Sequence, residues 1–124
     1  MGLFSVRVTI AHPLERQRQQ EVELLVDTGA TFSWVPRVIL EHLGLPRLQR
    51  QPFQMADGRV IERETAGGLV QLDGKEAIVT LVLAEPQDGC LLGATTLESL
   101  GFGVDPIRRQ LVPQQLLAMS VAAR

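Results

Sequence analysis

The sequence predicts a single all-β domain built mainly from antiparallel strands, with two short helices. Three observations favour this class: apolar and polar residues alternate, Asp-Gly dipeptides recur at a spacing of about one hairpin arm, and only two short segments have helical periodicity. The chain has 124 residues, of which 45% are apolar and 21% charged. That length suffices for one domain with a modest core, which we place at residues 1–124.

The chain begins with a predicted β-hairpin. Apolar side chains occupy every second position of the first strand, at Phe4, Val6, Val8 and Ile10. Polar residues 12–20 form a loop, and the segment "EVELLV" returns as a second strand that leads directly to Asp27.

Three Asp-Gly dipeptides predict tight turns in the centre of the chain: Asp57-Gly58, Asp73-Gly74 and Asp88-Gly89. This dipeptide favours turns with positive φ, and the segments between the dipeptides carry alternating β-branched residues or short apolar runs. We therefore expect three hairpin turns with antiparallel strands between them.

Two short segments predict helices. Residues 36–43 have apolar side chains at helical spacing and stop at Gly44. Residues 95–100 begin with a capping-box pattern, Thr95 and Glu98, and stop at Gly101. Each has about two turns, too few to be stable alone, so we expect both to pack on the sheet.

Two segments also resemble each other, "LLVDTGAT…HLGL" and "GCLLGATTLESLGF". Both run from an apolar pair through Gly-Ala to a short helix and Leu-Gly, although the first inserts Asp-Thr before its glycine. Common turn chemistry would also produce this similarity, so an internal repeat stays open.

Composition argues against several classes of protein. A net charge of −2 gives no basic field for nucleic acid or for an acidic membrane, and the apolar run at 77–84 is too short to span a bilayer. Cys90 is the one cysteine and no leader is recognisable, so we expect a cytoplasmic setting. His12 and His42 have no metal-ligand spacing, so neither a metal nor a cofactor is expected.

The residue that most suggests chemistry is Asp27. A carboxylate at the end of a buried strand is costly unless it is hydrogen-bonded, paired or solvated. The small residues Thr28, Gly29 and Ala30 predict a tight loop that presents the carboxylate, with the Thr28 hydroxyl locking the turn. The alternative is an aspartate that only caps a turn.

A hydrolytic role for Asp27 needs a second acid. One carboxylate can accept a proton from water, but amide hydrolysis without a metal or nucleophile also needs a proton donor, and two aspartates that share one proton supply both functions. None of the remaining aspartates is followed by Thr-Gly or Ser-Gly: Asp57, Asp73, Asp88 and Asp105. The second acid would then be Asp27 of another copy in a two-fold homodimer.

The segments "VDTGA", "TFSWVP", "MADGR" and "LLGATTLESLGFGVDP" together resemble the retroviral-type, retropepsin-like aspartic proteases, especially their single-domain bacterial relatives. The resemblance runs from about Ser5 to Pro113. It implies a closed antiparallel β barrel whose active site lies on the two-fold axis of a homodimer. The implied activity is that of an aspartic endopeptidase acting on a peptide or protein substrate.

The resemblance also assigns roles around the active site. It makes Asp27 the catalytic residue, with Thr28 gripping the loop of the partner chain and Gly29 offering backbone to the substrate. It places Leu91, Leu92 and Gly93 beside the active-site loop.

A flap over the bound peptide is implied for the hairpin of Met55, Ala56, Asp57 and Gly58. An antiparallel groove with such a roof holds an extended peptide through main-chain bonds. Trp34 either lines a subsite or belongs to the core.

Other interpretations stay open at this point. The same fold can serve as a catalytically silent peptide-binding or dimerisation module. A phosphoryl-transfer site at Asp27 is disfavoured, because Gly29 occupies the position where such motifs carry a second aspartate. The tail at 114–124 extends past the family's usual ending; it would complete the dimer interface as a strand or helix, pack as a short helix, or fray.

Overall fold

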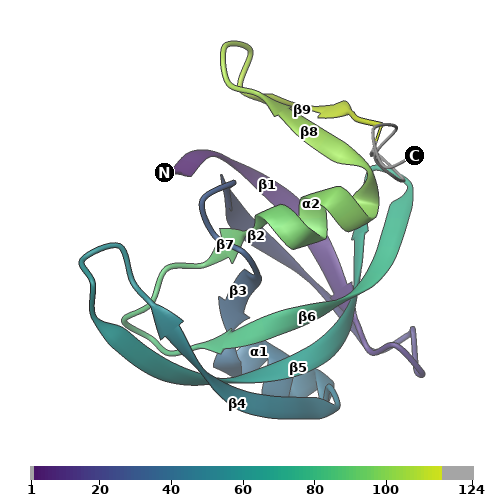
Figure 1. Ribbon diagram of the computed structural model, residues 1–124. Helices are drawn as coiled ribbons and strands as arrows, with labels where there is room; N and C mark the ends of the chain where they lie inside the picture. The colour runs from purple at the N-terminus through teal and green to yellow at the C-terminus, as the bar shows by residue number, and fades with distance from the viewer. Residues whose placement is uncertain (1, 116–124) are drawn as a thin grey trace, which may run out of the picture.

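The computed structural model describes residues 2–115, which form nine strands and two short helices (Figure 1). In chain order the elements are β1 (Gly2–Ala11), β2 (Gln19–Asp27), β3 (Ser33–Pro36), α1 (Arg37–Leu43), β4 (Arg47–Gln54), β5 (Val60–Leu72), β6 (Lys75–Ala84), β7 (Leu91–Leu92), α2 (Ala94–Leu100), β8 (Phe102–Asp105) and β9 (Gln110–Pro113). None of the helices in this range is long and apolar enough to cross a membrane.

Seven strands form one sheet that closes on itself. Their order is β1-β2-β7-β3-β6-β5-β4, and β1 also pairs with β5, so that six of the strands make a ring (Figure 1). The predicted all-β class is confirmed. Two pairs, β2–β7 and β3–β6, are parallel rather than antiparallel. One reason is that the chain crosses from β6 into the gap between β2 and β3, so β7 runs in the direction of β2.

The core lies inside the ring, and the alternation read from the sequence places its side chains there. Val8 and Ile10 of β1 are fully buried, whereas Ser5 and Arg7 between the apolar positions are exposed. The predicted hairpin of the first two strands is present, with Val8 opposite Val22. Burial of these apolar side chains is the main stabilising term for such a small domain.

Two of the three predicted Asp-Gly hairpin turns are confirmed. Gly58 turns β4 into β5 with φ of 89°, and Asp73-Gly74 turns β5 into β6 with φ values of 49° and 78°. The third prediction, Asp88-Gly89, is wrong, because β6 does not pair with β7. Residues 85–90 instead carry the chain across to β7, and Asp88 has a different role there.

Both predicted helices are present and end at glycines in the left-handed conformation, Gly44 and Gly101. The predicted capping box at Thr95 is wrong. Helix α2 begins one residue earlier, and Gly93 is its N-cap without a side-chain cap. The first N–H groups of α2 bond instead to carbonyl groups of the loop that follows Asp27, as the next section describes.

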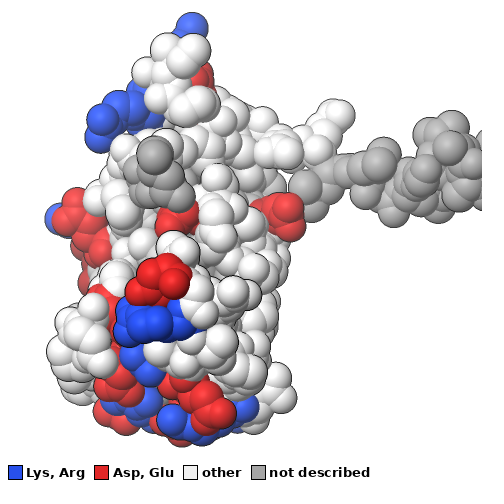
Figure 2. Space-filling model, turned by 60° about the vertical axis from the view of Figure 1, so that its left-hand side comes forward, with Lys and Arg blue, Asp and Glu red and all other residues white. Residues whose placement is uncertain are grey.

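After α2, strands β8 and β9 form a separate hairpin that projects from the ring (Figure 1). Gln114 then donates its N–H to the Gly101 carbonyl at 2.9 Å. The predicted interface role of the tail falls largely on residues 116–124, which lie outside the described residues. On the face shown in Figure 2, basic and acidic side chains lie next to one another rather than gathering by sign.

Candidate active site

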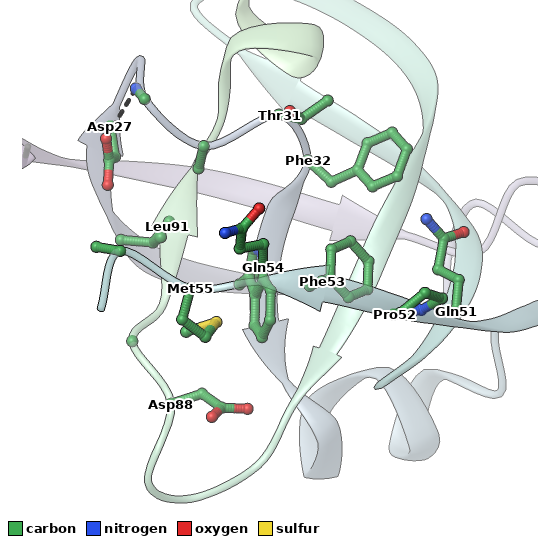
Figure 3. A pocket seen from close by; sticks show the side chains of 15 residues that line it. Asp27, Thr31, Phe32, Gln51, Pro52, Phe53, Gln54, Met55, Asp88 and Leu91 are labelled. Carbon is green, nitrogen blue, oxygen red and sulfur yellow. Dashed lines mark hydrogen bonds between the residues drawn. The ribbon is translucent and has the colours of Figure 1, made fainter. Parts of the chain in front are cut away.

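The turn at the end of β2 presents Asp27 at the surface. The Gly29 N–H donates to Asp27 Oδ1 at 2.9 Å, and the Ala30 N–H donates to the Asp27 carbonyl at 3.1 Å (Figure 3). Asp27 is half-buried, whereas Thr28 and Gly29 are exposed. The backbone therefore fixes the carboxylate while the tip of the turn stays accessible to another molecule.

Helix α2 holds the loop that follows this turn. The Ala94 N–H donates to the Ala30 carbonyl at 2.8 Å, and the Thr95 N–H donates to the Thr31 carbonyl at 3.0 Å. The first N–H groups of a helix have no partner within it, so these bonds satisfy the helix and the loop together. The position of Asp27 thus depends on a segment more than sixty residues further along the chain.

A buried polar contact strengthens the same junction. Ser33 Oγ accepts a hydrogen bond from the Gly93 N–H at 2.9 Å and shares another with Thr96 Oγ1 at 2.6 Å. Both hydroxyl side chains are almost fully buried. A Cβ on Gly93 would lie under 3.0 Å from the Phe32 and Ala30 carbonyl oxygens, so this close approach needs glycine. Sequence reasoning missed Ser33 and Thr96, although each is a short polar residue next to apolar ones.

The predicted segment Leu91-Leu92-Gly93 does lie beside the active-site turn. Leu91 and Leu92 of β7 pair in parallel with Leu25 and Val26 of β2. The two similar segments of the sequence are therefore neighbours in space. Gly93 follows β7 where Asp27 ends β2, so the second segment contributes no carboxylate at the equivalent place.

A cleft of about 860 Å³ extends from Asp27 along the turn and under the β4–β5 hairpin (Figure 3). Its floor is Trp34, which is only 7% exposed and meets the Phe53 ring edge-on at a centroid distance of 5.2 Å. Met55 and Leu91 pack against the same apolar cluster. Trp34 therefore belongs to the core and also lines the cleft, while its role as a substrate subsite stays a prediction.

The β4–β5 hairpin covers the cleft on one side. Met55 and Ala56 line the cleft, whereas Asp57 and Gly58 form the exposed tip. The Arg59 N–H donates to Asp57 Oδ1 at 3.0 Å, and this backbone bond is the first cause of a lowered Asp57 pKa. The structure therefore brings two of the four predicted flap residues to the cleft.

Asp88 borders the cleft on the side away from Asp27 (Figure 3). Its carboxylate accepts two hydrogen bonds from Arg63, at 2.7 Å from Nε and 2.9 Å from Nη2. This bidentate contact is the main reason that the Asp88 pKa lies below its usual range. Sequence reasoning took Asp88 for a turn residue, because its partner is 25 residues away and no local pattern links them.

Cys90 is not activated as a nucleophile. Burial raises the pKa of the half-buried Cys90 thiol, which keeps it protonated and a poor nucleophile. Within residues 2–115, no three His, Cys, Asp or Glu side chains gather in a way that would hold a metal ion.

The chain was compared with models of protein families. A family model described as "gag-polyprotein putative aspartyl protease" matches residues 16–99, which is more than half of the chain. The matched range contains the Asp27 turn, the β4–β5 hairpin and the Leu91–Gly93 segment. No match to a curated protein is found.

Proposed function

The chain belongs to the gag-polyprotein putative aspartyl protease family, and on that premise we propose that it is a homodimeric endopeptidase in which Asp27 is the catalytic residue. The observation that carries the proposal is the placement of Asp27. Its carboxylate sits on a backbone-fixed turn, at the edge of a cleft that a β-hairpin covers.

The need for a second copy follows from where the other aspartates of residues 2–115 lie. Asp88 is the other aspartate at the cleft, and its carboxylate is engaged by Arg63. Asp57 is at the hairpin tip, Asp73 is in the turn between β5 and β6, and Asp105 ends β8; none of the three lines the cleft. One copy therefore provides one suitable carboxylate. A two-fold axis beside the exposed Thr28-Gly29 tip would bring a second Asp27 to the first.

The proposed chemistry uses the two carboxyl groups as acid and base. Two carboxylates held close together share one proton, because both cannot be ionised at that distance. The ionised Asp27 accepts a proton from water as the water oxygen attacks the peptide carbonyl carbon. The protonated Asp27 of the partner donates its proton to the carbonyl oxygen. Collapse of the resulting diol breaks the C–N bond, and the amine leaves with a proton from the dyad.

The cleft suits an extended peptide. Apolar side chains make up much of its wall, including Trp34, Phe53 and Leu91, and backbone groups at Gly29 lie at its edge. Main-chain hydrogen bonds would give affinity, and the apolar wall would accept alternate side chains. We expect cleavage next to apolar residues.

Cleavage of a peptide library by the parent and by Asp27→Asn tests this function. We expect the substitution to lower the cleavage rate by about 10³-fold or more, since it removes acid–base chemistry. The matched control is Asp73→Asn, the same chemical change in an exposed turn whose positive φ asparagine tolerates. This control should cleave at the parent rate.

Mixing experiments test the shared site. Excess Asp27→Asn added to a fixed amount of parent should lower cleavage, because mixed dimers carry a single suitable carboxylate. Excess Asp73→Asn should not lower it. Dilution of the parent should also reduce the specific activity as dimers dissociate. If excess Asp27→Asn leaves the parent rate unchanged, each copy has a complete site and the shared dyad is wrong.

A further inference from the structure

The β4–β5 hairpin extends beyond the part of β5 that pairs with β6. Strand β5 pairs with β6 only from Thr65 onward, whereas the pairs from Gln51–Arg63 to Gln54–Val60 involve β4 and β5 alone. We call residues 51–63 the arm. Two-stranded hairpins are marginally stable alone, so the arm depends on its contacts with the rest of the chain.

An ion pair joins the base of the arm to the loop at residues 85–90, which borders the cleft. Arg63 of the arm binds Asp88 through two hydrogen bonds, and the side chains are only 13% and 5% exposed. Just outside the arm, Glu64 and Arg47 of the hairpin pair with Arg37 and Glu41 of α1. Two other ion pairs lie within the hairpin, Arg50 with Glu62 and Asp57 with Arg59. Those side chains are all more than half exposed, so solvent weakens their pairing.

The loop that carries Asp88 is itself firmly anchored. Asp88 Oδ2 accepts a bond from the Glu85 N–H at 2.8 Å, which closes the turn at residues 85–88. Arg37 of α1 binds the Glu85 carboxylate at 2.9 Å, and the Cys90 carbonyl accepts the Leu25 N–H at 3.1 Å. The loop therefore attaches the arm to the body at Asp88, three residues before β7, the strand that flanks the active-site turn.

The remaining contacts between the arm and the body that the structure describes at the cleft are apolar. Phe53, Met55 and Ile61 pack over Trp34 in one cluster. Apolar contacts are not directional and allow the arm to slide or lift, whereas a bidentate ion pair fixes its orientation.

We propose that the Arg63–Asp88 ion pair holds the arm over the cleft, so that both side chains are positioning residues for peptide binding. This inference rests on the proposed function for its substrate. It adds a specific determinant: the closed arrangement of the arm depends on the Arg63–Asp88 ion pair, which joins the arm to the loop at residues 85–90. Loss of either partner leaves the other charge poorly compensated and frees the base of the arm.

Trp34 provides a test that needs no catalysis, because it is the only tryptophan in the chain and lies under the arm. We expect Arg63→Gln and Asp88→Asn each to raise acrylamide quenching of Trp34 fluorescence by about twofold or more as open states gain population. Asp88→Asn retains an oxygen that can accept the Glu85 N–H, so it mainly removes the charge. Arg63→Lys keeps the positive charge but cannot make the bidentate contact, so we expect its acrylamide quenching to lie between those of the parent and Arg63→Gln.

The matched control is Arg50→Gln, which breaks an exposed ion pair of the same hairpin and should leave quenching at the parent value. Far-ultraviolet circular dichroism and urea unfolding of each variant show whether the fold is intact. If folded Arg63→Gln and Asp88→Asn quench like the parent, the proposal is overturned.

Peptide cleavage gives a second readout that separates this proposal from the proposed function. If the arm positions the peptide, KM rises about tenfold in Arg63→Gln while kcat changes less than about threefold. An unchanged KM in a cleaving enzyme overturns the positioning role even though the protease function stands. A parent that cleaves nothing refutes the proposed function, and Trp34 quenching alone then decides whether the ion pair holds the arm.

Discussion

Asp27 and Asp88 border the same cleft, but their surroundings differ. Asp27 ends a strand on a turn of small residues, and backbone N–H groups fix its position. Asp88 is 5% exposed and is neutralised by a bidentate arginine. The comparison teaches that two carboxylates of one cleft are held in different ways: a hydrogen bond from the backbone of its own turn holds Asp27, whereas an ion pair to a distant arginine restrains Asp88 for structural use.

The largest expected effect on stability comes from a substitution at Gly93, which packs against the loop that follows Asp27. Gly93→Ala places a Cβ against the backbone carbonyls of Phe32 and Ala30, and backbone cannot move aside as a flexible side chain can. We expect a loss of about 3 kcal/mol in the free energy of unfolding, measured by urea denaturation. The displaced loop should also lower peptide cleavage.

Gly67→Ala is the control for that substitution. Gly67 lies in β5, near the base of the arm, and a Cβ there meets nothing within 4 Å. We expect its unfolding free energy to stay within about 0.5 kcal/mol of the parent. Equal losses in the two variants would show that glycine replacement as such, rather than the contact with the active-site loop, is responsible.

A smaller effect is expected from the hydroxyl pair in the same junction. Ser33→Ala removes the acceptor of the Gly93 N–H and the partner of Thr96, which leaves buried polar groups unsatisfied. We expect a loss of about 1–3 kcal/mol in unfolding free energy. In a double-mutant cycle with Thr96→Val, the two losses should not add, since both remove the same bond. Full additivity would mean that the two hydroxyls act separately.

The two sides of the cleft also differ in how far the sequence predicted them. The Asp27 turn is local: an apolar strand followed by small residues indicates a presented carboxylate, and the glycine ends of both helices are local signals too. The α2 cap and the Arg63–Asp88 pair join residues that are far apart in the chain. Thr95 and Glu98 have the pattern of a capping box, yet the loop carbonyls at Ala30 and Thr31 bond to the helix instead.

Acid titration tests the Asp88 ion pair, and it carries the smallest expected effect. The folded-state pKa of Asp88 lies below its ordinary value of 3.8, so its ion pair stabilises the fold fully above that pH and is lost as the pH falls through the lowered pKa. The pKa of Glu64 is also lowered, chiefly by the hydrogen bond from Arg37, and its contribution is lost in the same direction. Parent stability should therefore decline on acidification.

Asp88→Asn shows how much of the acid-induced loss of stability comes from Asp88, because asparagine does not titrate and Glu64 is retained. In urea denaturation at a series of pH values, the variant should be less stable than the parent near neutral pH, and the difference should narrow as the pH falls below 3.8. Ser33→Ala removes no titrating group, so its difference from the parent should stay constant over the same range. A constant difference for Asp88→Asn would mean that the Asp88 carboxylate charge does not stabilise the fold.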